Sequence, residues 1–115
     1  MAPVDLEITP IERDGGRVLE LTGTIDLDTV PALRDALAET LEHRDGPVVV
    51  DLRKVEFMDS GGLAALLNAQ RRFTRADRKL SLIVVPGPVA RLLETTRLDT
   101  TFALADTPTQ ALELP

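Results

Sequence analysis

The stretch from residue 48 to residue 73 changes from a strand-like to a helix-like pattern, and this change constrains the fold more than any other feature. It begins with Val48-Val49-Val50, a run typical of a strand buried on both faces of a parallel sheet. After Asp59-Ser60-Gly61-Gly62, apolar residues recur at steps of three and four, which predicts a helix. The stripe consists of Leu63, Leu66, Leu67, Gln70 and Phe73. A serine beside a carboxylate therefore lies where a strand passes into a helix, next to free amide groups. The two glycines are expected to leave this turn open to another molecule.

Shorter patterns on both sides complete an α/β arrangement. Residues 4–11 and 17–22 alternate between apolar and polar around Asp14-Gly15-Gly16, which predicts a hairpin. A helix follows, with Asp28 or Thr29 as its cap and Pro31 in its first turn. Later patterns predict strands over residues 79–85 and 101–105, a short helix over 89–96, and a terminal helix that starts in a capping box at residues 107–110. The predicted fold is a mixed, mostly parallel sheet of about five strands, with an N-terminal hairpin and about four helices.

Composition excludes several classes of function. The chain has 115 residues, no cysteine, a net charge of −6 and one histidine, His43. Thiolate chemistry and metal sites built on several histidines are therefore excluded, and the negative charge argues against direct binding of nucleic acid or anionic membranes. No segment resembles a signal peptide or a membrane span of roughly 20 apolar residues. We expect a single cytoplasmic domain, residues 1–115, without cofactor or metal.

Two motifs resemble those of the STAS domain family, and in particular its stand-alone bacterial anti-sigma factor antagonists. The first is Gly23-x-Ile25-Asp26 with Thr29 before the first long helix. The second and more specific is Phe57-Met58-Asp59-Ser60-x-Gly62-Leu63, where the central strand passes into a helix. The resemblance extends from Leu6 to about Leu112 and implies the STAS fold.

The resemblance also implies a function without catalysis by this chain. In the family, the unphosphorylated antagonist binds a kinase-type anti-sigma factor and frees the sigma factor. The kinase then phosphorylates the serine after the aspartate, here Ser60, and the antagonist is released until a phosphatase of the PP2C type resets it. ATP and magnesium would belong to the kinase. The resemblance implies a partner-binding surface made of Asp26, Thr29, Asp59, Gly61, Gly62 and Leu63. Gly61 departs from the family, which often has a second Ser or Thr there.

Other interpretations of the same residues remain open. Within the fold, STAS domains also serve as non-switching subunits of transporter or sensor complexes. The string Asp26-Leu27-Asp28-Thr29-Val30 matches the motif of haloacid-dehalogenase-type phosphatases, in which the two aspartates bind magnesium and one attacks the substrate. The simpler interpretation of that string is an Asx turn followed by a helix cap.

Asp59-Ser60-Gly61-Gly62 also resembles the nucleophile segment of trypsin-like proteases, but His43 lies in a helix end and the chain is too short for two barrels. The simplest interpretation of this segment is a helix N-cap, where both Ser and Asp are favoured.

A few remaining residues have simple structural interpretations. Phe57 and Phe73 are expected in the core, and His43 at a solvated helix end. A local basic run, interrupted by Asp77, is expected on a solvated helix face, with a secondary docking patch as the alternative; it consists of Arg71, Arg72, Arg75 and Arg78. Asp51 is expected at a strand end, where its carboxylate would bond to backbone.

Overall fold

The computed structural model describes residues 5–113 and contains one five-stranded sheet and four helices. The elements in chain order are β1 (Leu6–Arg13), β2 (Gly16–Ile25), α1 (Val30–His43), β3 (Val48–Met58), α2 (Ser60–Arg75), β4 (Leu80–Ile83), α3 (Pro88–Thr95), β5 (Ala103–Ala105) and α4 (Pro108–Glu113). The strands lie in the order β1-β2-β3-β4-β5, with β1 antiparallel to β2 and every other pair parallel. The predicted fold class is confirmed, although β4 and β5 are shorter than the sequence pattern suggests.

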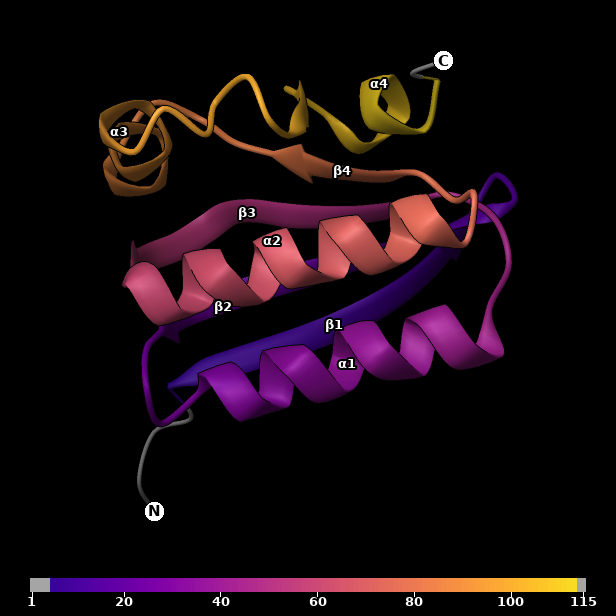
Figure 1. The fold of residues 1–115 in the computed structure, drawn as a ribbon, viewed down its shortest axis with the longest axis horizontal. Helices are drawn as coiled ribbons and strands as arrows, with labels where there is room; N and C mark the ends of the chain where they lie inside the picture. The colour runs from indigo at the N-terminus through magenta and orange to yellow at the C-terminus, as the bar shows by residue number, and fades with distance from the viewer. Residues whose placement is uncertain (1–4, 114–115) are drawn as a thin grey trace.

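Two hydrophobic clusters lie on opposite faces of the sheet. Successive residues of β3 point to opposite faces, so Val48, Val50 and Leu52 belong to the large cluster and Val49 belongs to the small one. The large cluster contains the buried stripes of α1, α2 and α3, and Figure 1 shows α1 and α2 side by side across the sheet. The small cluster is covered by α4 through Ala111 and Leu112. Burial on both faces explains the continuous apolar run with which β3 begins.

Phe73 lies in the core, as predicted, but the prediction for Phe57 is wrong. Phe73 is 1% exposed, whereas Phe57 is 51% exposed. The pairing of β2 with β3 shifts register twice, and each shift adds a residue on β3. Val55 belongs to the large cluster, and the residue added between Val55 and Phe57 reverses the alternation, so Met58 is buried and Phe57 is turned outward.

Two further predictions about charged residues need correction. Arg78 does not lie on a solvated face with Arg71, Arg72 and Arg75, which are exposed. Its guanidinium donates to the carbonyl oxygens of Gly46 at 3.1 Å and of Leu41 at 3.0 Å. It also lies 4.8 Å from the ring centre of Phe73. Arg78 therefore binds the end of α1 to the end of α2, because the last carbonyls of a helix need donors.

Asp51 lies inside β3 rather than at a strand end, and it is 4% exposed. Its carboxylate accepts from the backbone N–H of Arg53 at 3.1 Å and from the Arg53 guanidinium at 2.7 Å. The hydrogen bond to Asp51 is the main reason why the pKa of Arg53 is raised above its usual value. The backbone bond expected for Asp51 is therefore present.

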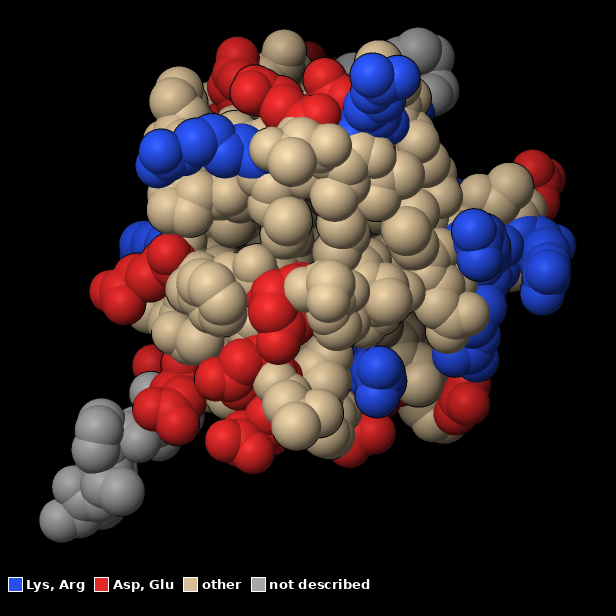
Figure 2. Space-filling view, turned by 60° about the vertical axis from the view of Figure 1, so that its left-hand side comes forward, with Lys and Arg blue, Asp and Glu red and all other residues tan. Residues whose placement is uncertain are grey.

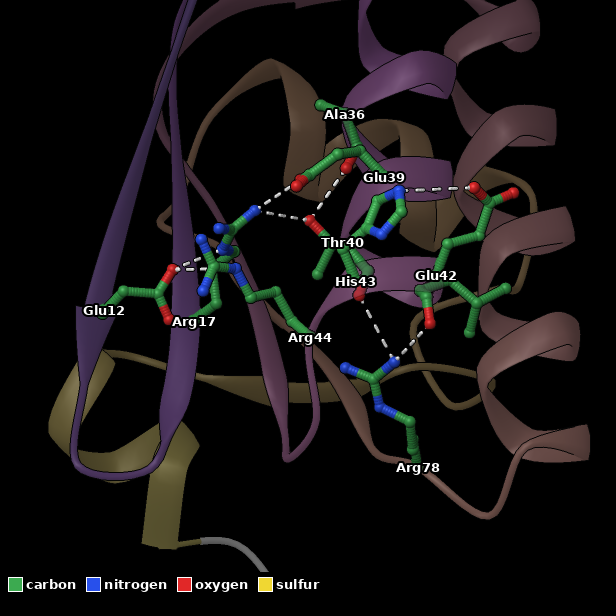
Figure 3. A network of polar contacts seen from close by, with 10 residues as sticks. Glu12, Arg17, Ala36, Glu39, Thr40, Glu42, His43, Arg44 and Arg78 are labelled. Atoms are coloured by element: carbon green, nitrogen blue, oxygen red, sulfur yellow. Dashed lines mark hydrogen bonds and ion pairs between the residues drawn. The ribbon is translucent and has the colours of Figure 1, made fainter.

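A buried arginine stabilises the end of the sheet at which β2 and β3 begin. Arg17 is 5% exposed and contacts Glu12 and Glu39, each at 2.6 Å, and Thr40 at 3.2 Å (Figure 3). Burial lowers the pKa of Arg17, but the hydrogen bonds to the two carboxylates more than offset this, so its pKa is raised. The hairpin and the end of α1 are thus joined by a paired, permanently charged group. His43 is exposed, as predicted.

Candidate functional site

The predicted site lies at the carboxyl ends of β2 and β3, where two chain turns meet. Ile25 pairs with Met58 at the end of the two parallel strands. The backbone N–H of Asp59 donates to the carbonyl of Ile25 at 3.1 Å, which joins the turn after β3 to the turn after β2. Both long helices begin at this edge of the sheet, on the left of Figure 1. The topology therefore brings the two sequence motifs together, although about thirty residues separate them.

Asp59 caps α2, and Ser60 is the first residue of that helix. The Asp59 carboxylate accepts from the backbone N–H of Gly62 at 3.0 Å. Ser60 is exposed, and its hydroxyl makes no hydrogen bond within residues 5–113. The interpretation of the segment as an N-cap is therefore confirmed for Asp59, whose carboxylate fills that role in place of Ser60. The hydroxyl stays available at a helix N-terminus, where an anion is favoured.

The two glycines after Ser60 differ in their surroundings. Gly61 is partly exposed, and a Cβ there would meet only the Asp59 side chain, with Oδ1 at 3.2 Å. Gly62 is buried, and a Cβ there would lie 2.6 Å from Ile25 Cγ2 and 2.7 Å from Met58 Cγ. The expectation that both glycines open the turn therefore holds for Gly61 and fails for Gly62, which allows α2 to pack closely on the strand ends.

Leu63 also faces inward, since it is 5% exposed and belongs to the large cluster. In the free protein its side chain fixes the position of the first turn of α2. Of the six residues predicted to bind a partner, Gly62 and Leu63 therefore lie beneath the surface, while Asp26, Thr29, Asp59 and Gly61 are at least partly accessible.

The turn after β2 is held by side chains that bond to backbone. Asp26 Oδ1 accepts from the N–H groups of Asp28 at 3.0 Å and Thr29 at 3.1 Å, which confirms the predicted Asx turn. The Thr29 hydroxyl accepts from the Asp26 N–H at 2.9 Å and donates to the Thr24 carbonyl at 2.8 Å. Thr29 is the N-cap residue of α1 but makes no side-chain cap bond, and Asp28 does not cap the helix either. Both Asp26 and Thr29 instead fix the shape of the loop.

Sequence reasoning missed Leu27, which lies at the centre of this loop and is 83% exposed. A single leucine between two aspartates gives no periodic signal, so pattern analysis passes over it. The structure shows that hydrogen bonds hold this loop in place and that it adjoins the Ser60 turn, which makes the exposed Leu27 a candidate contact residue.

The charges near Ser60 are negative. Asp26, Asp28 and Asp59 all lie in the two joined turns. Figure 2, which brings this side of the molecule forward, shows acidic side chains in the lower part of the face and again at its top, lysine and arginine side chains mainly around its margins, and a broad area without charged residues between them. Within residues 5–113, no group of three or more His, Cys, Asp or Glu side chains is arranged to hold a metal ion. None of the helices in this range is long and apolar enough to cross a membrane.

Comparison with known proteins identifies the family. The family described as Mlab, STAS domain, matches residues 10–106. The anti-sigma-F factor antagonist RsfB of Mycobacterium tuberculosis is 32% identical over 111 residues, which cover 96% of this chain and 90% of that protein. An anti-sigma-B factor antagonist of Staphylococcus aureus is 27% identical over 95 residues, which cover 83% of this chain and 88% of that protein.

Solved structures agree with these relatives. An anti-sigma factor antagonist from Mycobacterium paratuberculosis matches with a TM-score of 0.88 and 30% identity, covering 96% of this chain and 94% of that one. Unphosphorylated SpoIIAA matches with a TM-score of 0.69 over 90% of each chain, and at 18% identity it supports the fold alone. The chain is similar to proteins named as anti-sigma factor antagonists, and it belongs to the STAS domain family.

Proposed function

We propose that this protein is a cytoplasmic anti-sigma factor antagonist that binds a kinase-type anti-sigma factor and is released when Ser60 is phosphorylated. One observation carries the proposal: Ser60 is exposed at the first position of α2, while Asp59 supplies the cap. The serine hydroxyl is thus free for a kinase, and the fold does not depend on it. The similarity to anti-sigma factor antagonists supports the same conclusion.

The other serine of the chain provides a natural contrast. Ser81 lies in β4 and is 0% exposed, so no kinase can reach it in the folded protein. Ser60 is therefore the accessible serine of this sequence.

Phosphorylation at Ser60 changes the docking surface more than the fold. It adds about −1.5 to −2 charges at the N-terminus of α2, where the helix dipole and free N–H groups accommodate an anion. A partner surface placed over the turn would instead meet a bulky dianion beside Asp59. Because about 1.4 kcal/mol changes an equilibrium tenfold, the loss of a few kcal/mol at the interface is enough to release the partner.

The test combines the purified protein with kinase-type anti-sigma factors from its own organism, in the presence of ATP and magnesium. We expect one of them to add a single phosphate, located by peptide mass spectrometry on Ser60 and removed by a PP2C-type phosphatase. Ser60→Ala should abolish the modification and keep the binding, and Ser60→Asp should weaken binding without lowering the melting temperature. Ser81→Ala is the matched control and should be phosphorylated like the wild type.

A second function is favoured by one finding, the family description that names Mlab. In this case the protein would be a non-switching STAS subunit of a transporter or sensor complex. Protein isolated from native cells would then carry no phosphate in growth or stress, and its stable partner would not be a kinase.

The phosphatase interpretation has no such support. Asp26 Oδ1 accepts two backbone N–H groups of its own turn, which is the structural role expected of an Asx turn. The relatives of the chain are named as anti-sigma factor antagonists, so we do not propose hydrolysis through Asp26 and Asp28.

A further inference from the structure

The two most exposed large hydrophobic side chains among the described residues lie at the same edge of the sheet. Leu27 is 83% exposed and Phe57 is 51% exposed, compared with 38–40% for Ile11, Val85 and Leu104. Leu27 follows the end of β2 by two residues, and Phe57 is the penultimate residue of β3. Phe57 pairs with Thr24 across the two strands. Both apolar groups therefore flank the paired strand ends that lead into the Ser60 turn.

The loop that carries Leu27 is fixed rather than loose. The turn is closed on both sides of Leu27, because the Asp26 carboxylate accepts from the Thr29 N–H and the Thr29 hydroxyl accepts from the Asp26 N–H. The same hydroxyl donates to the Thr24 carbonyl. A side chain exposed in this way adds little to the core, so core packing does not explain a leucine here. A rigidly presented apolar group does suit binding, because less conformational entropy is lost when a partner covers it.

Phe57 is presented by an equally rigid element. The extra β3 residue between Val55 and Phe57 turns Phe57 away from the core, while Met58 beside it is buried. Such bulges re-aim side chains near functional sites.

We propose that Leu27 and Phe57 are the apolar anchors of the surface that docks the anti-sigma factor, an inference that rests on the proposed function. The Ser60 turn is bonded to the strand end before Leu27 and follows directly after Phe57, so a partner that covers both anchors also covers Ser60. A phosphate on Ser60 then falls inside the contact area, where it must be desolvated, rather than at a hydrated rim.

The charges define the kind of partner that fits. The carboxylates of Asp26, Asp28 and Asp59 lie in the same two turns as the anchors, and no lysine or arginine lies in residues 24–30 or 56–63. The complementary surface is an apolar recess bordered by lysine and arginine side chains. Binding of such a partner weakens as the salt concentration rises, because dissolved ions screen its attraction to the exposed carboxylates.

The experiment measures the dissociation constant of the anti-sigma factor that binds the wild-type protein, by titration calorimetry. Leu27→Ala and Phe57→Ala should each weaken binding about tenfold or more, as truncated interface anchors do. Leu104→Ala is the matched control, because it removes an exposed leucine from β5, the outermost strand on the other side of β4 from β3. Melting curves by circular dichroism should show that Leu27→Ala is folded like the wild type. Raising the ionic strength from about 0.05 to about 0.5 M should weaken wild-type binding.

The outcomes separate this inference from the proposed function. If Ser60→Asp weakens binding while Leu27→Ala and Phe57→Ala bind like the wild type, the anchors are refuted and the switch stands. If no kinase-type anti-sigma factor binds the wild type, both are refuted. If the protein itself forms a dimer and Leu27→Ala dissociates that dimer, the anchors bind a second copy of this chain, which contradicts the proposal. Binding that salt leaves unchanged would contradict the cationic border.

Discussion

The two glycines after Ser60 are expected to respond in opposite ways to the same substitution. A Cβ at Gly62 would lie 2.6 Å from Ile25 Cγ2 and 2.7 Å from Met58 Cγ, whereas carbon atoms in contact are about 3.5–4.0 Å apart. Gly62→Ala therefore requires a shift of roughly 1 Å between α2 and the strand ends. Ile25 is 0% exposed and Met58 is 5% exposed, so neither side chain has free space into which it can move.

The magnitude follows from two opposing effects. Overpacking a filled core costs about 1–3 kcal/mol. Replacing glycine by alanine within a helix returns about 0.5–1 kcal/mol, because the unfolded chain loses less entropy. We expect Gly62→Ala to lower the free energy of unfolding by about 1–2 kcal/mol, which corresponds to a fall in melting temperature of about 4–8 °C per kcal/mol.

Gly61→Ala is the internal control, because its Cβ would meet only the end of the Asp59 side chain at 3.2 Å. That variant should be neutral or more stable by up to about 0.5 kcal/mol. The chain has no tryptophan or tyrosine, so urea unfolding is best followed by circular dichroism at the helix band. A Gly62→Ala protein as stable as the wild type, or an equal loss in Gly61→Ala, would refute the distinction between a packing glycine and a surface glycine.

Two further substitutions test other features of the fold. Ser81→Ala should raise the free energy of unfolding by up to about 1 kcal/mol, because the Ser81 hydroxyl is buried and has no hydrogen-bond partner within residues 5–113; a loss of stability in urea would contradict this. Arg97→Gly should raise the melting temperature, because Arg97 has φ of 60° at the end of α3, where a residue with a Cβ is strained by about 1 kcal/mol. Arg91→Gly, in the interior of the same helix, should lower it.

The sequence predicted the order of the elements because its periodicity was strong where packing is strong. The run Val48-Val49-Val50 is buried on both faces, as expected of a central parallel strand. Leu63, Leu66 and Phe73 in the predicted stripe of α2 are buried, because a helix has one period, whereas Leu67 and Gln70 are only half-buried. The turn of Asp26 could be predicted because its hydrogen bonds are local.

The failures share a physical cause, since each depends on contacts between distant parts of the chain. Alternation counted from the buried Val55 predicts Phe57 in the core, and the extra β3 residue between them, which reverses the alternation, exists only in the pairing of β3 with β2. Arg78 was placed in solvent because its partners are carbonyl groups more than thirty residues away. Gly62 was assigned to an open surface because its neighbours Ile25 and Met58 are known only from the packed structure.

The arrangement of polar groups separates stability from regulation within one small sheet. Arg17 and its two carboxylates hold together the end of the sheet where the parallel strands begin, and Arg17, like any arginine, keeps its charge at every physiological pH. At the other end of these strands, the Asp59 carboxylate accepts from the Gly62 N–H in the first turn of α2, which leaves Ser60 without a structural role. A charge added to Ser60 therefore meets a favourable helix terminus inside the protein and an acidic surface outside it. This geometry allows a modification to change what binds at the surface while the free energy of folding stays nearly constant.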